Sequence, residues 1–255
     1  MLSLDGGRMQ PGRISFGGQP HDLGQKTMFD REAQNGVFSA PNAFKWAILS
    51  LQGDQENVRA KETFVREFQT ACQRSKLAVS EPVMQELPRN AQQWLQAMRD
   101  LRQADFILLV VPARGRKKDD LNLYKLTKRL AISELAVPTQ VVLSKTLTGK
   151  GVTSIVSKVL TQVVAKLNNG APWGLVQPEC SDAPTMVCGV DVWHGQGKSI
   201  MGFTASLDQN FSKYTSDVKT QDMKEEMSAE IAGCVKGCAE GFRALNGMWP
   251  ARIVI

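Results

Sequence analysis

Hydrophobic and polar positions follow one pattern between residues 44 and 169. Short apolar runs are separated by longer segments in which apolar residues recur every three or four positions, as expected for strands that alternate with amphipathic helices. This alternation favours a parallel α/β sheet with helices on both faces. We predict strands over 44–51, 76–79, 105–112 and 139–144, and helices over 57–76, 89–103, 121–135 and 152–169.

The pattern changes near Thr185. Three apolar-alternating segments, 185–194, 198–208 and 213–221, follow one another with only short turns between them. This spacing predicts an antiparallel meander rather than strands joined by helices. A helix over 224–247 and a strand over 251–255 are expected next.

Composition and pattern together predict how the chain divides into domains. Residues 1–42 are rich in Gly, Gln, Asp and Pro and show little periodicity, which indicates a linker. We expect a first domain over 43–172, a connector over 173–184, and the N-terminal portion of a second, truncated domain over 185–255.

Composition disfavours several classes of protein. The chain has five cysteines without a CxxC pair and two histidines, so a disulfide framework and a structural zinc site are both disfavoured. The N-terminus lacks the apolar segment of a signal peptide, and no window approaches 18 uninterrupted apolar residues. These features predict a protein of the cytoplasm or nucleus that is neither secreted nor membrane-spanning.

The net charge of +6 is concentrated in one part of the chain. Residues 113–170 hold 11 Lys or Arg against 3 Asp or Glu, a local balance of +8 that leaves about −2 for the rest. Such a concentration suits a phosphate backbone and predicts salt-sensitive association, although a solvated basic helix face is the alternative. Within it, the loop 113–120 follows a predicted strand, at the end of a parallel sheet where ligands bind.

Two pairs of polar residues share helix faces within this basic segment. Tyr124 and Lys128 are four residues apart on one predicted helix, Gln162 and Lys166 are four apart on another, and Gln140 opens the strand between them. The set offers two cations for a terminal phosphate, amide donors for its oxygens, and a ring on which a base stacks. Ordinary solvated residues would show the same spacings.

Carboxylates form a second candidate site. Asp191 ends an apolar strand, and Glu225, Glu226 and Glu230 begin the following helix. Converging carboxylates of this kind hold the metal ions of two-metal phosphodiester cleavage. Exposure of Asp191 at the strand end, and stabilisation of the helix dipole by the glutamates, are the alternatives.

The ordered blocks YKLTK, TQVVLSKTL, TQVVAKLNNGAPW, MVCGVDVWH and SIMGFTASLD resemble the MID domain and the start of the PIWI domain of Argonaute proteins. Within that superfamily the chain is most similar to the PIWI branch. The resemblance spans roughly residues 44–255 and implies a Rossmann-like MID domain with a parallel sheet, followed by an incomplete RNase H-like PIWI domain. It also implies a protein that binds the 5′-phosphorylated end of a piRNA-like guide RNA in gene silencing.

The resemblance implies roles for individual residues. Tyr124, Lys128, Gln140, Gln162 and Lys166 match the family's pocket for the guide 5′ phosphate, with Tyr124 stacking on the first base. Gln162 stands where classical Argonautes tend to carry lysine. A divalent cation, Mg²⁺ or Mn²⁺, is implied to supply the missing positive charge there. The loop that follows the strand 105–112 matches the segment that contacts the first base.

The resemblance also implies a partial catalytic centre. Asp191 matches the first carboxylate of the family's metal-dependent slicer site, and Glu226 matches its mobile glutamate, with Glu225 as the alternative register. The second aspartate and the last metal ligand of the family lie beyond a strand resembling 251–255. We therefore expect the chain as given to hold an incomplete magnesium site and not to cleave RNA.

Three hypotheses follow from these observations. The first is a module that binds guide RNA and, through it, target RNA and silencing-complex proteins. The second is a parent protein that acts as a guide-directed, metal-dependent endoribonuclease. The third, a nucleotide-binding α/β protein unrelated to RNA, lacks the glycine fingerprint that binds pyrophosphates.

Overall fold

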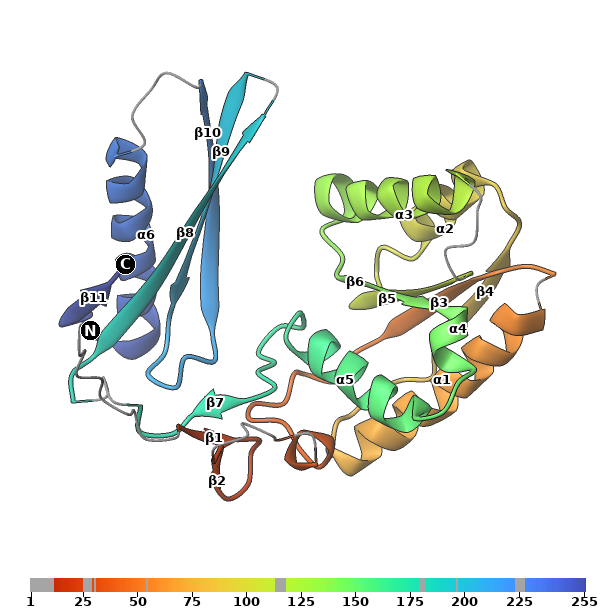
Figure 1. The fold of residues 1–255 in the computed structure, drawn as a ribbon, viewed down its shortest axis with the longest axis horizontal. Helices are drawn as coiled ribbons and strands as arrows, with labels where there is room; N and C mark the ends of the chain where they lie inside the picture. The colour runs from red at the N-terminus through yellow and green to blue at the C-terminus, as the bar shows by residue number, and fades with distance from the viewer. Residues whose placement is uncertain are drawn as a thin grey trace, which may run out of the picture. The chain divides into compact units, whose positions relative to one another are not determined.

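The structure, a computed structural model, describes residues 12–24, 29, 31–53, 55–112, 118–178, 182–195, 197–222 and 228–255 (Figure 1). The described residues form two compact units. One, the parallel-sheet unit, contains those within 16–18 and 29–172. The other, the meander unit, contains those within 12–15, 19–24 and 173–255.

A parallel sheet with strand order β4-β3-β5-β6 forms the centre of the parallel-sheet unit. One set of helices lies on each face of this sheet (Figure 1). The predicted parallel sheet with helices on both faces is therefore confirmed. The strands are β3 (Trp46–Leu51), β4 (Val83–Leu87), β5 (Phe106–Val111) and β6 (Thr139–Leu143); the helices are α1 (Gln55–Arg74), α4 (Ser144–Leu147) and α5 (Val152–Val164) on one face, and α2 (Ala91–Asp100) and α3 (Lys118–Leu130) on the other.

Aromatic side chains dominate the core between the sheet and α1. Trp46 stacks on Phe106 with ring centroids 5.4 Å apart, and Phe68 lies 4.9 Å from Trp46. All three are buried, and every residue of β3 and β5 is buried as well. Continuous apolar strands are what a sheet covered on both faces requires, which explains why these two strands were predictable.

The segment 76–79, predicted to be a strand, is instead the end of α1. Lys76 has a φ of 55°, and its N–H donates to the carbonyl of Gln73 while the N–H of Leu77 donates to that of Cys72. This is a Schellman cap, in which the residue after the left-handed position packs back on the helix. Leu77 is accordingly buried. The apolar letters of this segment therefore reflect helix capping, and only Val79 forms an isolated bridge.

The strand next to β3 is β4, which lies a few residues further along the chain. It pairs with β3 on one side only and forms an edge of the sheet. Val83 and Met84 are more than half exposed, so the strand lacks the buried alternation by which sequence analysis finds strands.

The predicted helix 121–135 is composite. The α-helix α3 ends at Leu130, and the chain continues as one π-helical turn, Ala131–Leu135. Ala136 follows with a φ of 51°, and this left-handed residue ends the helix before β6.

The meander unit contains the predicted antiparallel strands, in the order β10-β9-β8-β11. β11 pairs in parallel with β8, and α6 packs on one face over Met186, Met201 and Phe203. This mixed α/β arrangement is consistent with the predicted RNase H-like fold. The elements are β8 (Thr185–Gly195), β9 (Lys198–Ser206), β10 (Tyr214–Asp222), α6 (Ser228–Asn246) and β11 (Arg252–Val254).

Short elements occur in the described part of the first 42 residues. Strand β1 (Arg13–Ser15) pairs with β2 (His21–Asp22) and with β7 (Gly174–Leu175), and a 3-10 turn spans Glu32–Gln34. Among the described residues, no helix is long and apolar enough to cross a membrane.

Candidate nucleic-acid site

Four of the predicted site residues lie together at the amino end of β6. The helices α3 and α5 both run back along the sheet, so their C-terminal ends meet at the amino ends of the strands (Figure 1). Lys128 belongs to the last turn of α3, and Lys166 to the turn that follows α5. Cations at helix C-termini are favoured by the helix dipole, so this edge of the sheet suits a pair of lysines.

Both ammonium groups bind Thr139, the first residue of β6. The Nζ of Lys128 donates to the main-chain oxygen of Thr139 at 3.0 Å and to its Oγ1 at 2.8 Å. The Nζ of Lys166 donates to the same main-chain oxygen at 3.0 Å. One residue therefore holds both cations.

A chain of amides continues from Lys166. Its Nζ donates to the Oε1 of Gln140 at 2.6 Å, and the Nε2 of Gln140 donates to the Oε1 of Gln162 at 2.8 Å. Because an ammonium group is only a donor, it fixes which end of the Gln140 amide is oxygen. The order of donors then directs the Nε2 of Gln162 away from Gln140, where its two N–H groups can meet an anion.

The surroundings of the two lysines lower the pKa of both side chains. Burial, and then the charge of Lys166, lower the pKa of Lys128, and burial lowers the pKa of Lys166. The hydrogen bonds that both ammonium groups make to described residues end on neutral oxygens. Neutral acceptors do not cancel the charges, so an anion placed between the lysines would stabilise both.

Tyr124 lies one turn before Lys128 on α3, and its side chain is 37% exposed. Among the described residues it takes no part in the hydrogen bonds of the lysine and glutamine cluster. The loop predicted to contact the first base, 113–120, falls largely outside the described residues. It begins at the carboxyl end of β5, whereas the cluster lies at the amino end of β6, and α3 connects these two ends of the sheet.

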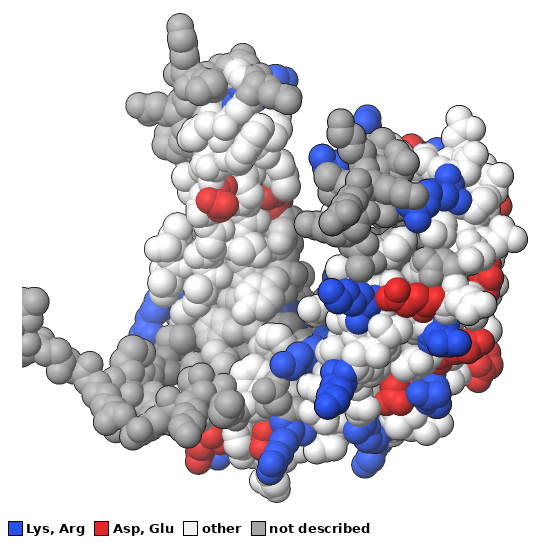
Figure 2. Space-filling model, turned by 45° about the vertical axis from the view of Figure 1, so that its right-hand side comes forward, with Lys and Arg blue, Asp and Glu red and all other residues white. Residues whose placement is uncertain are grey.

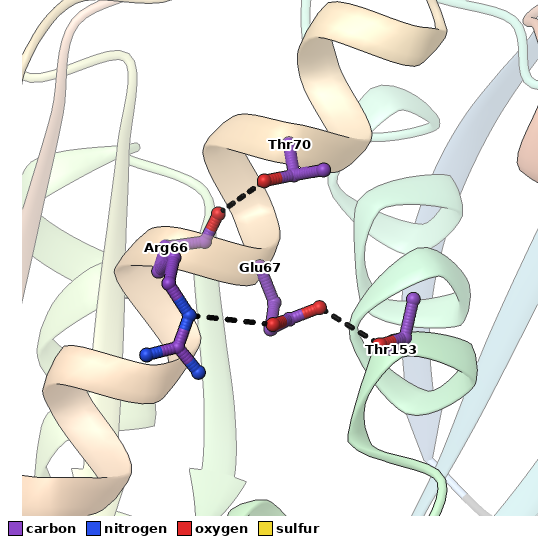
Figure 3. A network of polar contacts seen from close by, with 4 residues as sticks. All are labelled: Arg66, Glu67, Thr70 and Thr153. Atoms are coloured by element: carbon purple, nitrogen blue, oxygen red, sulfur yellow. Dashed lines mark hydrogen bonds and ion pairs between the residues drawn. The ribbon is translucent and has the colours of Figure 1, made fainter.

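Contacts with α1 hold α5 in place. The Oγ1 of Thr153, in the first turn of α5, donates to Glu67 of α1 at 2.8 Å, and Glu67 is also 3.5 Å from the Nε of Arg66 (Figure 3). Gly151, the N-cap of α5, supplies no capping side chain. The carboxylate of Glu67 therefore supplies negative charge at a helix N-terminus, where the dipole favours it, and anchors the helix that carries Gln162.

Basic and acidic side chains are mixed on one face of the parallel-sheet unit (Figure 2). Figure 2 shows Lys and Arg on the parallel-sheet unit interspersed with Asp and Glu on the face in view. The convergence of Lys128 and Lys166 is the more specific feature.

The predicted carboxylate site is only partly described. Asp191 is exposed on β8, on the sheet face opposite α6, and pairs with Gly202 of β9. Glu225 and Glu226 lie outside the described residues, and Glu230 is exposed in the first turn of α6. Among the described residues, no three His, Cys, Asp or Glu side chains are grouped to hold a metal ion.

Residues 106–255 match the Piwi domain family. This chain belongs to the Piwi family. It is 25% identical over 258 residues to protein argonaute-3 of Drosophila melanogaster, a match that covers 99% of this chain and 29% of that protein. It is 36% identical over 135 residues to the Piwi-like protein Siwi of Bombyx mori, covering 52% of this chain and 15% of Siwi. This chain thus spans less than a third of the length of either relative.

Solved structures have the same fold. Drosophila Piwi superposes with a TM-score of 0.80 at 21% identity, covering 96% of this Piwi family chain and 33% of that one. The Argonaute of Kluyveromyces polysporus, solved with a guide RNA, superposes with a TM-score of 0.70 at 14% identity, covering 96% and 33%. The predicted family, its PIWI branch and the fold class are confirmed.

One residue of the cluster was not predicted from the sequence. Thr139 contributes a main-chain oxygen, which every residue has, and a hydroxyl that is not distinctive at the start of a strand. Its position immediately before Gln140 was the only signal available.

Proposed function

We propose that this chain binds the 5′-phosphorylated end of a small, piRNA-like guide RNA and acts in RNA-guided gene silencing. The observation that supports this most is the convergence of the Lys128 and Lys166 ammonium groups on Thr139. Membership of the Piwi family and the likeness to an Argonaute solved with a guide RNA support it further.

Each residue of the cluster has a role in this proposal. Lys128 and Lys166 bind the terminal phosphate as a pair of cations, and Gln162 donates from its Nε2 to a phosphate oxygen. Gln140 orients Lys166 and Gln162 through both ends of its amide. Tyr124 presents an exposed ring, on which the first base of the guide stacks.

A divalent cation, Mg²⁺ or Mn²⁺, is part of the proposal. The Oε1 of Gln162 accepts one hydrogen bond from Gln140, and an amide oxygen has a second lone pair. It fits as a single hard oxygen ligand, with phosphate oxygens of the guide as the others. The cation would supply positive charge beside the phosphates.

The partners follow from this function. A bound guide pairs with target RNA, and we propose that silencing-complex proteins then join the assembly. We propose that the chain acts in the cytoplasm or the nucleus, where guide and target RNA are present.

A second candidate is guide-directed, metal-dependent cleavage of RNA by the parent protein. It is favoured by Asp191, which is exposed on the face of the meander sheet opposite α6. Gly202, its cross-strand partner, places no side chain beside it. In this proposal Asp191 and Glu226 hold Mg²⁺.

Binding of a short fluorescent single-stranded RNA tests the main proposal. The full chain should bind the 5′-phosphate form more tightly than the 5′-hydroxyl form of the same RNA. Combined Lys128→Ala and Lys166→Ala substitution should abolish this preference, a loss on the order of 100-fold for two charge-assisted hydrogen bonds. Added Mg²⁺ should strengthen binding of the phosphate form selectively.

The control removes the same charge elsewhere in the same unit. Lys145 and Lys150 are both exposed. Replacing both with alanine should weaken the binding of the 5′-phosphate and the 5′-hydroxyl RNA by the same factor. Equal binding of the two RNAs by the unsubstituted chain would refute the proposal.

A further inference from the structure

Thr139 lies where three elements of the parallel-sheet unit meet. It is the first residue of β6, an edge strand, and is 6% exposed. Its two oxygens accept donors from two different segments, Lys128 at the end of α3 and Lys166 after α5. Because each Nζ is 3.0 Å from the same oxygen, the two nitrogens are no further apart than twice that distance.

The hydrogen bonds leave a defined number of donors. An ammonium group has three N–H donors. Lys128 uses two of them on Thr139, and Lys166 uses one on Thr139 and one on Gln140. Within the described contacts, one N–H of each lysine remains for a ligand, so two oxygens of one anion can each accept a charged donor.

The chemistry of the acceptor matters as much as its position. A carboxylate at this place would hold two lysines more strongly, but it would also neutralise part of their charge. The carbonyl and hydroxyl of Thr139 orient the ammonium groups and leave both charges to the ligand. Bringing two like charges together without a counterion is unfavourable in the absence of ligand, and these hydrogen bonds offset part of that cost.

We propose that Thr139 is a positioning residue that sets the spacing of the two lysines for a terminal phosphate. This inference rests on the proposed binding of 5′-phosphorylated RNA and adds a residue to that site. The main-chain oxygen of residue 139 accepts hydrogen bonds from both lysines, and every substitution at this position keeps it. The hydroxyl accepts a second hydrogen bond from Lys128, and substitution can remove it.

The alternative is that Thr139 only begins a strand. Valine has the shape of threonine without its hydroxyl and favours strands, so Thr139→Val preserves the local structure and removes one acceptor of Lys128. Serine keeps the hydroxyl and loses the methyl group, so Thr139→Ser keeps the acceptor for Lys128 and changes the packing instead. A residue with only a structural role would tolerate valine at least as well as serine.

The experiment measures the ratio of affinities for 5′-phosphate and 5′-hydroxyl RNA, using the full chain. Thr139→Val should reduce this ratio about tenfold, the effect of one hydrogen bond to a charged group, while Thr139→Ser keeps it close to that of the unsubstituted chain. Thr204→Val is the control, because Thr204 is also a strand threonine whose hydroxyl bonds a carbonyl, in the meander unit. It should leave the ratio unchanged.

The outcomes separate the two proposals. If the unsubstituted chain does not prefer the 5′-phosphate, the proposed function fails and this inference fails with it. If the preference exists and Thr139→Val retains it, only the inference is overturned. Should the valine variant not fold, Thr139→Ala against Thr139→Ser gives the same comparison, because these two side chains differ only in the hydroxyl. Equal ratios for this pair would overturn the inference.

Discussion

Lys128 and Lys166 donate to one shared main-chain oxygen, that of Thr139, each at 3.0 Å. Repulsion between the two cations and their loss of solvation both oppose this arrangement. Burial lowers the pKa of both lysines, and the charge of Lys166 lowers the pKa of Lys128 further. The fold thus brings two positive charges together on neutral acceptors.

The first prediction concerns pH. The lowered pKa values mean that both ammonium groups lose their protons at lower pH than ordinary lysines, whose pKa is about 10.4. As pH is raised, the preference for 5′-phosphate RNA should therefore start to fall before that value is reached. The phosphate itself is a dianion well above its second pKa of about 6, so it does not contribute to the change. Affinity for both RNAs across the alkaline range is the measurement.

A suitable control for the pH profile is the 5′-hydroxyl RNA, whose binding depends on solvated lysines. Its affinity should decline later. A phosphate preference that stays constant up to the range of ordinary lysine would contradict the prediction.

The second prediction concerns the stability of the ligand-free chain. A lysine whose pKa is lowered in the folded state is charged at a cost, and this cost is fully present below the folded pKa. It disappears as pH rises towards the pKa of the unfolded chain. Lys128→Met should thus raise the free energy of unfolding at neutral pH, by up to about 1 kcal/mol after allowance for solvent screening, and reduce the phosphate preference without abolishing it. Urea unfolding at neutral and alkaline pH measures the gain, which should shrink at alkaline pH.

The control for the second prediction is Lys150→Met, because Lys150 is exposed. A stability gain of equal size there would show that the effect belongs to methionine rather than to the site.

The third prediction concerns the anchor of α5. Thr153→Val removes the 2.8 Å hydrogen bond to Glu67 (Figure 3) and should lower the free energy of unfolding by about 1 kcal/mol. Affinity for 5′-phosphate RNA should fall much less than in the Lys166→Ala variant, because Thr153 lies at the other end of the helix from Lys166. Chemical unfolding and RNA binding of the same sample check both statements.

Thr148→Val is a matched control for the anchor. Its hydroxyl donates at 3.3 Å to a carbonyl three residues away, within the same turn, so its loss should cost less. An unchanged stability of Thr153→Val would mean that the anchor contributes nothing.

The sequence predicted the fold more fully than the site. Strands such as β5 were predictable because burial on both faces demands an unbroken apolar run. β4 was not, because an edge strand with an exposed Val83 carries no such demand. The segment containing Leu77 was assigned to a strand because a helix cap also buries apolar residues.

Helical spacing placed Tyr124 and Lys128 on one face, and Gln162 and Lys166 on another, but it contained no distances between helices. The order of donors from Lys166 through Gln140 to Gln162 arises only when α5 packs beside β6. Thr139 was missed because its main-chain oxygen leaves no trace in the sequence. The roles assigned to these residues remain predictions.

The fourth prediction concerns Cys72, a buried residue of α1. Burial raises the pKa of its thiol to about 12. Since the thiolate is the reactive form, iodoacetamide at mildly alkaline pH should modify Cys72 only after unfolding, as mapped by mass spectrometry against the unfolded chain in urea. Below the unfolded value of 9.0 the thiol is neutral in both the folded and the unfolded chain, so the stability that goes with the raised pKa is fully present. As pH rises from 9.0 towards about 12 only the unfolded chain loses the proton, and this contribution to stability is lost. Cys72→Ala should therefore flatten the alkaline decline in stability, and equal alkylation rates with and without urea would contradict the buried thiol.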